Sequence, residues 1–237
     1  YKKNEFNHYR IECMGNEVKT WVNGTAVAYV VDTLDRTGFI GLQVHGIGSN
    51  LENDGKKVYF KNINIQTGNL KPKAFPKGIY TVNLTPNSLS SYEKSAGYKL
   101  LFDGKTNNGW VGAYKTSFPA KGWKIQDGVI SVEPSGGAES TNGGDIVTKE
   151  EYASFDLSFE FKLTPGANSG VKYFVTLSEK NTGSAIGLEY QVLDDVLHPD
   201  AKLGRDGNRT LASLYDLMTA KKEARFLRPI GSWNNGR

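Results

Sequence analysis

The chain has 237 residues, of which 38% are hydrophobic and 23% charged, as is usual for a globular protein with a packed core. Its formal net charge of +4 arises from scattered Lys and Arg without a long basic run, so we expect no nucleic acid partner. Cys13 is the single cysteine, which excludes an internal disulfide, and no apolar stretch is long enough for a membrane-spanning helix.

Alternation of apolar and polar residues with a period of two dominates the chain and predicts β-strands. From the amino terminus, such runs cover residues 9–13, 18–22, 27–31, 39–44, 58–65, 123–125, 130–132, 155–163, 171–177 and 188–192. Asn23-Gly24 and Asp127-Gly128 lie between neighbouring runs and predict tight hairpin turns. Helical periodicity is nearly absent, so the sequence predicts an all-β fold of antiparallel sheets.

Residues 69–95 interrupt the alternation. This segment holds Pro72, Pro76 and Pro86 together with several Asn and Ser residues. Such a composition is typical of a linker, so we expect residues 69–95 to lie along a surface between two parts of the chain.

The two ends of the chain share a short pattern. "EFNHYR" and "SWNNGR" both read aromatic, Asn, two residues, Arg, with Phe6 aligned to Trp233. A match this short also arises by chance, but it is compatible with tandem copies of one domain that are cut at equivalent points.

Longer motifs carry a resemblance to a known family. "GYKLLFDGKTNNGWVG", "WKIQDGVISV", "GGDIVTKEEYASFDLSFEFKLTPGANSGVKYFV" and "GLEYQVLDD…HPD" resemble the front half of the DUF1080 family, also called the 3-keto-disaccharide hydrolase domain. "FNHYRIECMGNEVKTWVNGTAVAYVVDT…RTGFIGLQVHG…KVYFKNINIQ" resembles the back half of the same domain. The back half therefore comes first in this chain.

The resemblance implies a concanavalin A-like jelly roll, which is a sandwich of two antiparallel sheets. Residues 1–68 would be the C-terminal half of one unit and residues 96–237 the N-terminal half of the next. We expect the two halves to pack as one circularly permuted domain, because half a jelly roll would expose an apolar face and unpaired edges. Exchange of halves between two chains is the alternative.

One polar face in each half suggests a site. Glu189 and Gln191 share a face of the run 188–192, Lys172 is on a polar face of the neighbouring run, and Gln43 and His45 share a face of the first half. If these faces line the concave sheet, they converge over one groove. Alternatively, His45 is an ordinary solvent-exposed residue of a strand and has no part in a site.

The family activity implies a task for these groups. A sugar oxidised at C3 has an acidified C2 hydrogen, whose removal allows the C1 substituent to leave, and addition of water then gives net hydrolysis. We assign Glu189 or His45 as the base and Lys172 as the group that neutralises developing charge. The candidate substrate-binding residues are Gln43, Gln191, Asn168, Tyr215 and His198.

The stretch "LDDVLHPD" raises the question of a divalent metal ion. Asp194 and Asp195, with His198 and Asp200 nearby, offer oxygen and nitrogen ligands. The spacing matches no strict metal motif, and Asp residues that cap turns in a polar loop would look the same. No cofactor is certain on this evidence.

Two other functions remain open at this stage. A conventional glycoside hydrolase would use a pair of carboxylates, for which Glu189 and Asp194 are candidates. A non-catalytic carbohydrate-binding module would use a groove dominated by aromatic side chains. All three functions have a carbohydrate partner, and the family implies a periplasmic or extracellular location.

Overall fold

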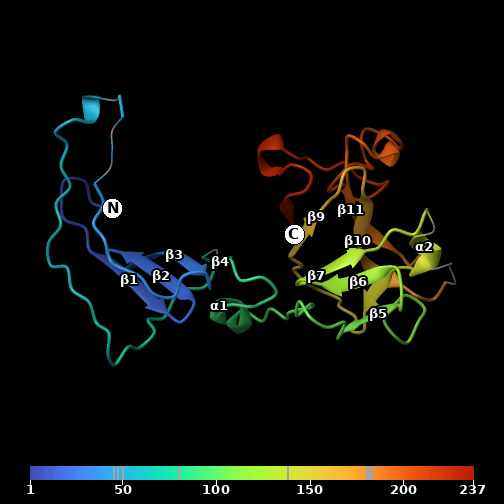
Figure 1. Cartoon of the computed structure of the whole chain (residues 1–237), viewed down its shortest axis with the longest axis horizontal. Coiled ribbons are helices and arrows are strands. Elements are labelled where there is room, and N and C mark those ends of the chain that lie inside the picture. The colour runs from blue at the N-terminus through green and yellow to red at the C-terminus, as the bar shows by residue number, and fades with distance from the viewer. Residues whose placement is uncertain (45, 47, 50, 80, 138, 180–183) are drawn as a thin grey trace. The chain divides into compact units, whose positions relative to one another are not determined.

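The computed structural model describes all residues except 45, 47, 50, 80, 138 and 180–183. It divides into two compact units, Tyr1–Asp103 and Gly104–Arg237, which are described separately. Strands dominate both units, and the helical elements are short (Figure 1). The all-β prediction is therefore confirmed. Within the described residues, no helix is both long enough and apolar enough to cross a bilayer.

A four-stranded sheet forms the first unit. It contains β1 (Tyr9–Met14), β2 (Glu17–Val22), β3 (Thr25–Val31) and β4 (Thr81–Asn83) in that order. The first three strands are antiparallel neighbours, and β4 runs parallel to β3 (Figure 1).

The turn and the core of this sheet follow from local sequence. Asn23 and Gly24 both have positive φ, at 49° and 85°, so they form the tight hairpin that the sequence predicts between β2 and β3. Trp21, Tyr29 and Val31 are fully buried and form the core of the unit.

The segment predicted as a linker is part of the first unit. The ring of Phe75 meets those of Trp21 and Tyr29 edge to face, with centroids 5.6 and 5.3 Å apart. Glu12 accepts a hydrogen bond from the backbone N–H of Lys73 at 3.0 Å. Since residues 81–83 also form strand β4, the segment packs on the sheet rather than only crossing a surface.

A short capped helix ends this segment. α1 (Ser91–Ser95) begins with a capping box, in which the Ser90 hydroxyl accepts from the Glu93 N–H and Glu93 accepts from the Ser90 N–H. Glu17 on β2 accepts from the Ser91 N–H at 3.0 Å, which fixes the helix to the sheet.

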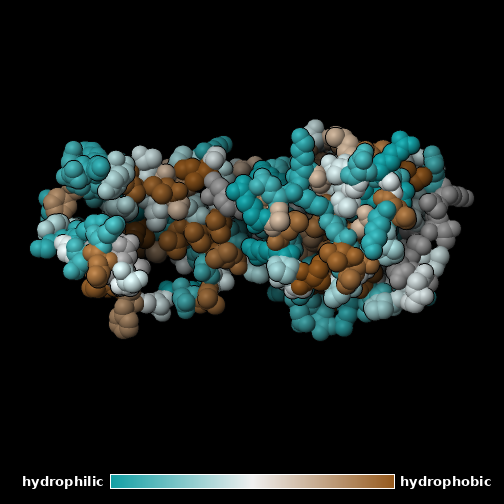
Figure 2. Space-filling view, turned by 90° about the horizontal axis from the view of Figure 1, so that it is seen from above, coloured by the Kyte–Doolittle hydropathy of each residue, from teal (hydrophilic) through white to brown (hydrophobic). Residues whose placement is uncertain are grey.

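Two predicted strands of the first unit are wrong. The described residues of 39–44 and 58–65 form no strand, and η1 (Leu51–Asn53) is the regular element between them. Their apolar side chains face solvent: Ile40 is 77% and Val44 97% exposed. Apolar side chains, drawn in brown, reach the surface in Figure 2. An alternating pattern marks a face that can be buried, but a strand forms only where another strand pairs with it.

Four antiparallel pairs build the second unit. β5 (Trp110–Gly112) pairs with β8 (Ile146–Thr148), and β6 (Trp123–Gln126) with β7 (Val129–Val132). β9 (Phe159–Lys162) pairs with β12 (Trp233–Gly236), and β10 (Asn168–Thr176) with β11 (Ile186–Leu193). The short helical elements are α2 (Glu139–Asn142), η2 (Pro199–Lys202) and η3 (Ala224–Phe226).

Both the turns and the apolar face of this unit bear on the sequence predictions. Asp127 and Gly128 have positive φ, at 53° and 78°, and close the predicted β6–β7 hairpin. Strict alternation along this run would put Phe174 on the same face as Lys172, but its ring lies against those of Phe155 and Tyr173, with centroids 5.6 and 5.7 Å apart. The register shifts between Tyr173 and Thr176, and Phe174 has a φ of 52°, so a β-bulge turns its ring to the apolar face.

Candidate active site

The pairing of β10 with β11 places several predicted residues on one face. Lys172 lies directly opposite Glu189, and Gly170 directly opposite Gln191. Directly opposed residues of an antiparallel pair point to the same side of the sheet. Lys172, Glu189 and Gln191 therefore share one face, and the alternation in the sequence predicts the same grouping.

Glu189 fills the space above a glycine. A Cβ built on Gly170 would lie 2.0 Å from Oε1 of Glu189 and 2.6 Å from its Cδ. No other residue type at position 170 would leave room for the carboxylate in this position. The side chain is half-buried. This burial raises the pKa of Glu189, Lys172 opposes the shift, and the charges of Asp145 and Asp200 add to it.

A carboxylate with a raised pKa is suited to proton abstraction. A base works best when its pKa lies near the working pH, and half-burial among like charges moves a carboxylate in that direction. Among the predicted site residues, Glu189 thus has the surroundings that fit its assigned role most directly.

Lys172 is a fixed charge beside Glu189. Its Nζ donates to Oδ2 of Asp145 at 2.8 Å, and to the hydroxyl of Ser184 and the carbonyl of Ala185 at 3.1 Å each. An ammonium group has three N–H donors, and these contacts use all of them. In this arrangement Lys172 has no N–H left to donate to a ligand, and it affects its neighbours through its charge.

A loop segment borders β11 and brings Tyr215 to the site. The Ala212 N–H donates to the Gln191 carbonyl at 2.8 Å, and the Gln191 N–H to the Ser213 carbonyl at 3.0 Å. The Tyr215 N–H donates to the Glu189 carbonyl at 2.9 Å. Residues 212–215 thus continue the sheet beyond β11 and fix the backbone of Tyr215 next to that of Glu189.

The side chain of Gln191 is buried, although the sequence predicts it on the open polar face. The side chain is 1% exposed, and its Oε1 accepts from the Val192 N–H at 3.0 Å. A ligand cannot reach this amide, so the assignment of Gln191 to substrate binding is wrong in this structure. The alternating pattern identifies the polar face but not which of its side chains are buried.

Comparison with known proteins gives this site a context. Residues 1–66 and 97–237 match the family described as the 3-keto-alpha-glucoside-1,2-lyase-like domain. The chain belongs to this family. The matched ranges lie on either side of the segment predicted as a linker, and the resemblance inferred from the sequence motifs is confirmed.

Two proteins that are similar to this chain are informative. A 3-keto-disaccharide hydrolase from Bacteroides thetaiotaomicron is 42% identical over 152 residues, which are 60% of this chain and 51% of the relative. The chain thus spans about half the length of this curated relative. The crystal structure of a candidate glycosyl hydrolase from Parabacteroides distasonis is 29% identical with a TM-score of 0.51, covering 64% of this chain and 67% of the other. This likeness fits the predicted β-sandwich, while the order of the two half-units stays a prediction.

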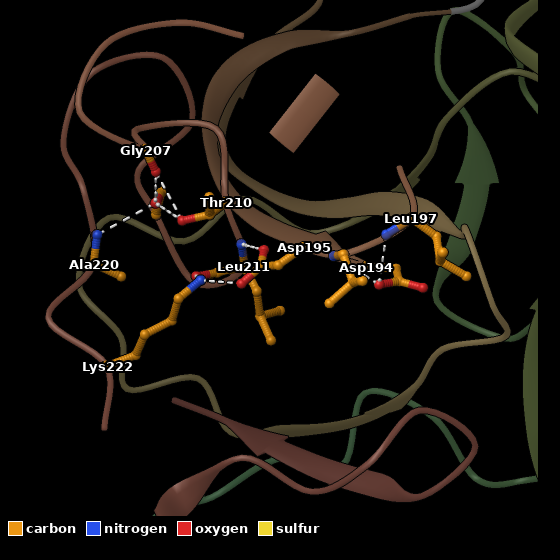
Figure 3. A network of polar contacts seen from close by, with 10 residues as sticks. Asp194, Asp195, Leu197, Gly207, Thr210, Leu211, Ala220 and Lys222 are labelled. Atoms are coloured by element: carbon orange, nitrogen blue, oxygen red, sulfur yellow. Dashed lines mark hydrogen bonds and ion pairs between the residues drawn. The ribbon is translucent and has the colours of Figure 1, made fainter. Parts of the chain in front are cut away.

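Asp194 and Asp195 hold loops together (Figure 3). Asp194 Oδ1 accepts from the N–H groups of Val196 and Leu197, and its Oδ2 accepts from that of Gly166 at 2.8 Å. The Gly166 bond is the main reason that the pKa of Asp194 is lowered.

Asp195 makes contacts of the same kind. It accepts from the Leu211 N–H at 2.7 Å and pairs with Lys222, as the dashed lines in Figure 3 show. In the described part of the chain, no three His, Cys, Asp or Glu side chains come together as metal ligands. The contacts of Asp194 and Asp195 are those of residues that fix loops, and a metal ion held by them stays a prediction.

The other predicted residues are dispersed. His198 Nδ1 accepts from the Asp200 N–H at 3.2 Å and caps η2, so Nε2 is the nitrogen that can meet a ligand. Asn168 is exposed at the start of β10, and Gln43 is exposed in the first unit. His45 lies outside the described residues.

Arg209 and Asp145 are the residues that sequence reasoning missed. Asp145 tethers Lys172 and also accepts from the Ala185 N–H at 2.9 Å. Arg209 pairs with Asp200 and Asp216. Both residues lie outside the alternating strands, in stretches where nothing local separates them from ordinary surface charges, so only the fold identifies them.

Proposed function

We propose that this protein cleaves 3-keto-glycosides by removing the C2 proton with Glu189. The observation that carries the proposal is the position of Glu189, half-buried above Gly170 and beside the fixed charge of Lys172. Membership of the 3-keto-alpha-glucoside-1,2-lyase-like family supports the substrate class. The curated relative, a 3-keto-disaccharide hydrolase, supports net hydrolysis.

The proposed reaction has two stages. The Glu189 carboxylate takes the C2 hydrogen as a proton, and the electron pair of the C2–H bond forms an enolate with the C3 carbonyl. The enolate then expels the C1 oxygen substituent, which takes up a proton, and a C1–C2 double bond forms as the carbonyl returns. Water adds its oxygen to C1 and a proton to C2, which completes hydrolysis.

The neighbours of Glu189 suit the first stage. The enolate carries negative charge that the ground state lacks, and the fixed ammonium of Lys172 stabilises such charge without reorganisation. We keep His45 as a second candidate for the base or for the acid that protonates the leaving group.

A role for His45 requires the two half-units to share one site. We propose that residues 1–68 and 96–237 complete one sandwich, because each half has apolar surface to cover. The second unit has an apolar hollow of about 520 Å³ lined by residues that include Phe159, Tyr173 and Tyr190. The first unit has the exposed alternating runs 39–44 and 58–65. A periplasmic or extracellular location, where glycosides are encountered, remains part of the proposal.

The surroundings of Glu189 favour catalysis over simple glycan binding. Charged groups surround it (Lys172, Asp145 and Asp200), whereas a binding module would present mainly aromatic rings. A conventional glycosidase pair of Glu189 with Asp194 is disfavoured, since the oxygens of Asp194 accept the backbone hydrogen bonds of a loop.

Turnover of methyl 3-keto-α-glucoside by the Glu189→Gln variant tests the proposal. Loss of a general base typically costs about 10²–10⁴-fold in rate. The matched control is Glu160→Gln, which removes an exposed carboxylate from β9. Turnover by the Glu189 variant at the wild-type rate would remove this residue from the mechanism. Cleavage of plain methyl α-glucoside by the wild type would favour a conventional glycosidase.

A further inference from the structure

Arg209 holds two carboxylates and one aromatic ring at the same time. Its Nη1 donates to Oδ1 of Asp200 at 3.0 Å, while Nε and Nη2 donate to the two oxygens of Asp216 at 2.9 and 3.1 Å. Its Cζ lies 5.3 Å from the centre of the Tyr215 ring. This arrangement uses the planar fork of a guanidinium group, which lysine cannot reproduce.

Tyr215 is held at its backbone and contacted on one face of its ring. The backbone N–H donates to the Glu189 carbonyl at 2.9 Å. Arg209 lies over one face of the ring, and the Asp200 carboxylate that Arg209 holds raises the pKa of the Tyr215 hydroxyl. The residue is only half-buried, so the side chain is not enclosed in the core.

A polar hollow adjoins the cluster at Asp216. It has a volume of about 630 Å³, within the usual range of small-molecule sites, and its lining includes Asp216, Arg205 and Asn208. Asp216 therefore belongs both to the hollow and to the pair with Arg209. Its lining does not include Tyr215, so the hollow is a neighbouring space and not the surface of the ring.

We propose that Arg209 and Asp200 are positioning residues that hold the Tyr215 ring as a stacking platform for a pyranose beside Glu189. The ring face opposite Arg209 would receive the C–H groups of the sugar, which match a flat apolar surface with a polar rim. The choice of a pyranose as ligand rests on the proposed function. The placement of Tyr215 by Asp200 and Arg209 does not.

Sugar binding without chemistry is the first test. Methyl α-glucoside lacks the 3-keto group, so its binding to the full chain can be measured by NMR titration without turnover. We expect Tyr215→Ala to weaken binding by at least about tenfold and Tyr215→Phe, which keeps the ring, to weaken it less. Arg209→Gln and Asp200→Asn should each weaken binding several-fold at a temperature where the variant is folded.

The chain offers a matched control in Arg225. This arginine also pairs with a carboxylate, that of Glu223 at 2.8 Å, and lies 4.6 Å from the ring of Phe226, but it is exposed. Arg225→Gln should bind methyl α-glucoside as the wild type does. If Arg209→Gln fails to fold, Arg209→Lys is the substitute, and it should weaken binding because one ammonium cannot hold both carboxylates.

The pKa of Tyr215 gives a second readout that does not depend on activity. Burial and the nearby Asp200 carboxylate raise this pKa, and Arg209 lowers it. Absorbance titrations, each compared with the Tyr215→Phe variant, should show a lower Tyr215 pKa in Asp200→Asn and a higher one in Arg209→Gln. A merely structural role for Arg209 would reduce stability without changing sugar affinity in the folded variant.

Three results would overturn the proposal. They are no binding of methyl α-glucoside by the wild type, unchanged binding by Tyr215→Ala, or a Tyr215 pKa that is the same in Asp200→Asn and Arg209→Gln as in the wild type. The proposed function fails on a different observation, namely normal turnover of the 3-keto substrate by Glu189→Gln. The two failures can therefore be told apart.

Discussion

Replacing Gly170 with alanine should displace the Glu189 carboxylate while leaving strand β10 intact. A Cβ at this position would lie 2.0 Å from Oε1, where ordinary contact begins at 3.4 Å. The carboxylate must therefore retreat by about 1.4 Å. The backbone of Gly170 does not have positive φ, so alanine can adopt its conformation without strain.

The size of the effect on activity follows from this displacement. A misplacement of about 1 Å in a catalytic constellation can cost about 10²-fold in rate, so we expect at least that loss in kcat/KM. Stability should change little, because the obstructing atoms belong to the end of a flexible side chain. An off-rotamer position costs about 0.5–1.5 kcal/mol. For a chain of this size, that corresponds to a Tm shift of only a few degrees, about 2–4 °C per kcal/mol.

The assay is turnover of methyl 3-keto-α-glucoside together with thermal unfolding. Gly38→Ala is the control, because a Cβ there meets nothing within 4 Å and the backbone φ is not positive. In the Glu189→Gln background, Gly170→Ala should cause almost no further loss, since the two changes act on the same group. Wild-type activity in Gly170→Ala, or a full additional loss in the double variant, would refute the reasoning.

Three further predictions concern charge and packing. Lys172→Met removes the charge that lowers the pKa of Glu189. The acidic limb of the pH–rate profile should therefore move to higher pH, and an unchanged acidic limb would contradict the assignment of Glu189 as the base. Backbone hydrogen bonds lower the pKa of Asp194. The ionised carboxylate therefore stabilises the fold fully above its ordinary pKa of about 4. This stabilisation is lost as the pH falls through the lowered pKa of the folded protein. Asp194→Asn should therefore lower Tm at pH 7 and weaken the acid dependence of unfolding, whereas a wild-type pH dependence would argue against this role. If the two halves complete one sandwich, Ile40→Asp should lower Tm more than Leu34→Asp, although the side chains are 77% and 83% exposed within the first unit. Equal Tm values would mean that Ile40 stays in solvent.

Local signals in the sequence predict local structure well. Asn23-Gly24 and Asp127-Gly128 form the hairpins expected of them, because both residues of each pair tolerate the positive φ that a tight turn needs. The alternation of β11 likewise predicts which side of the strand Glu189 occupies. These features depend on a few neighbouring residues.

Features that depend on distant partners could not be predicted in the same way. The run 39–44 alternates as regularly as β11 but forms no strand, since alternation does not say whether a partner strand is present. The segment 69–95 looked like a linker from its prolines, yet Phe75 packs between Trp21 and Tyr29. The composition of a segment indicates its flexibility, but it does not indicate which surface of the fold the segment packs against.

The candidate site shows the same division. The pairing of Glu189 with Lys172 follows from two strand patterns, but the burial of Gln191 does not, and the backbone of Gln191 is bonded to residues more than 20 positions away in the sequence. Arg209 has no motif of its own and gains its importance from the carboxylates of Asp200 and Asp216. Contacts between side chains on loops can be identified only from the folded structure, because the residues are distant in the sequence.

Exchange of the C2 hydrogen with deuterium is the measurement that tests the role of Glu189 most directly. With methyl 3-keto-α-glucoside in D₂O, the wild-type protein should introduce deuterium at C2 of the recovered substrate or product, as followed by NMR. Glu189→Gln should slow this exchange by about 10²–10⁴-fold, while Glu160→Gln should not. Exchange at the wild-type rate in the Glu189 variant, or cleavage by the wild type without any deuterium at C2, would contradict proton abstraction by this residue.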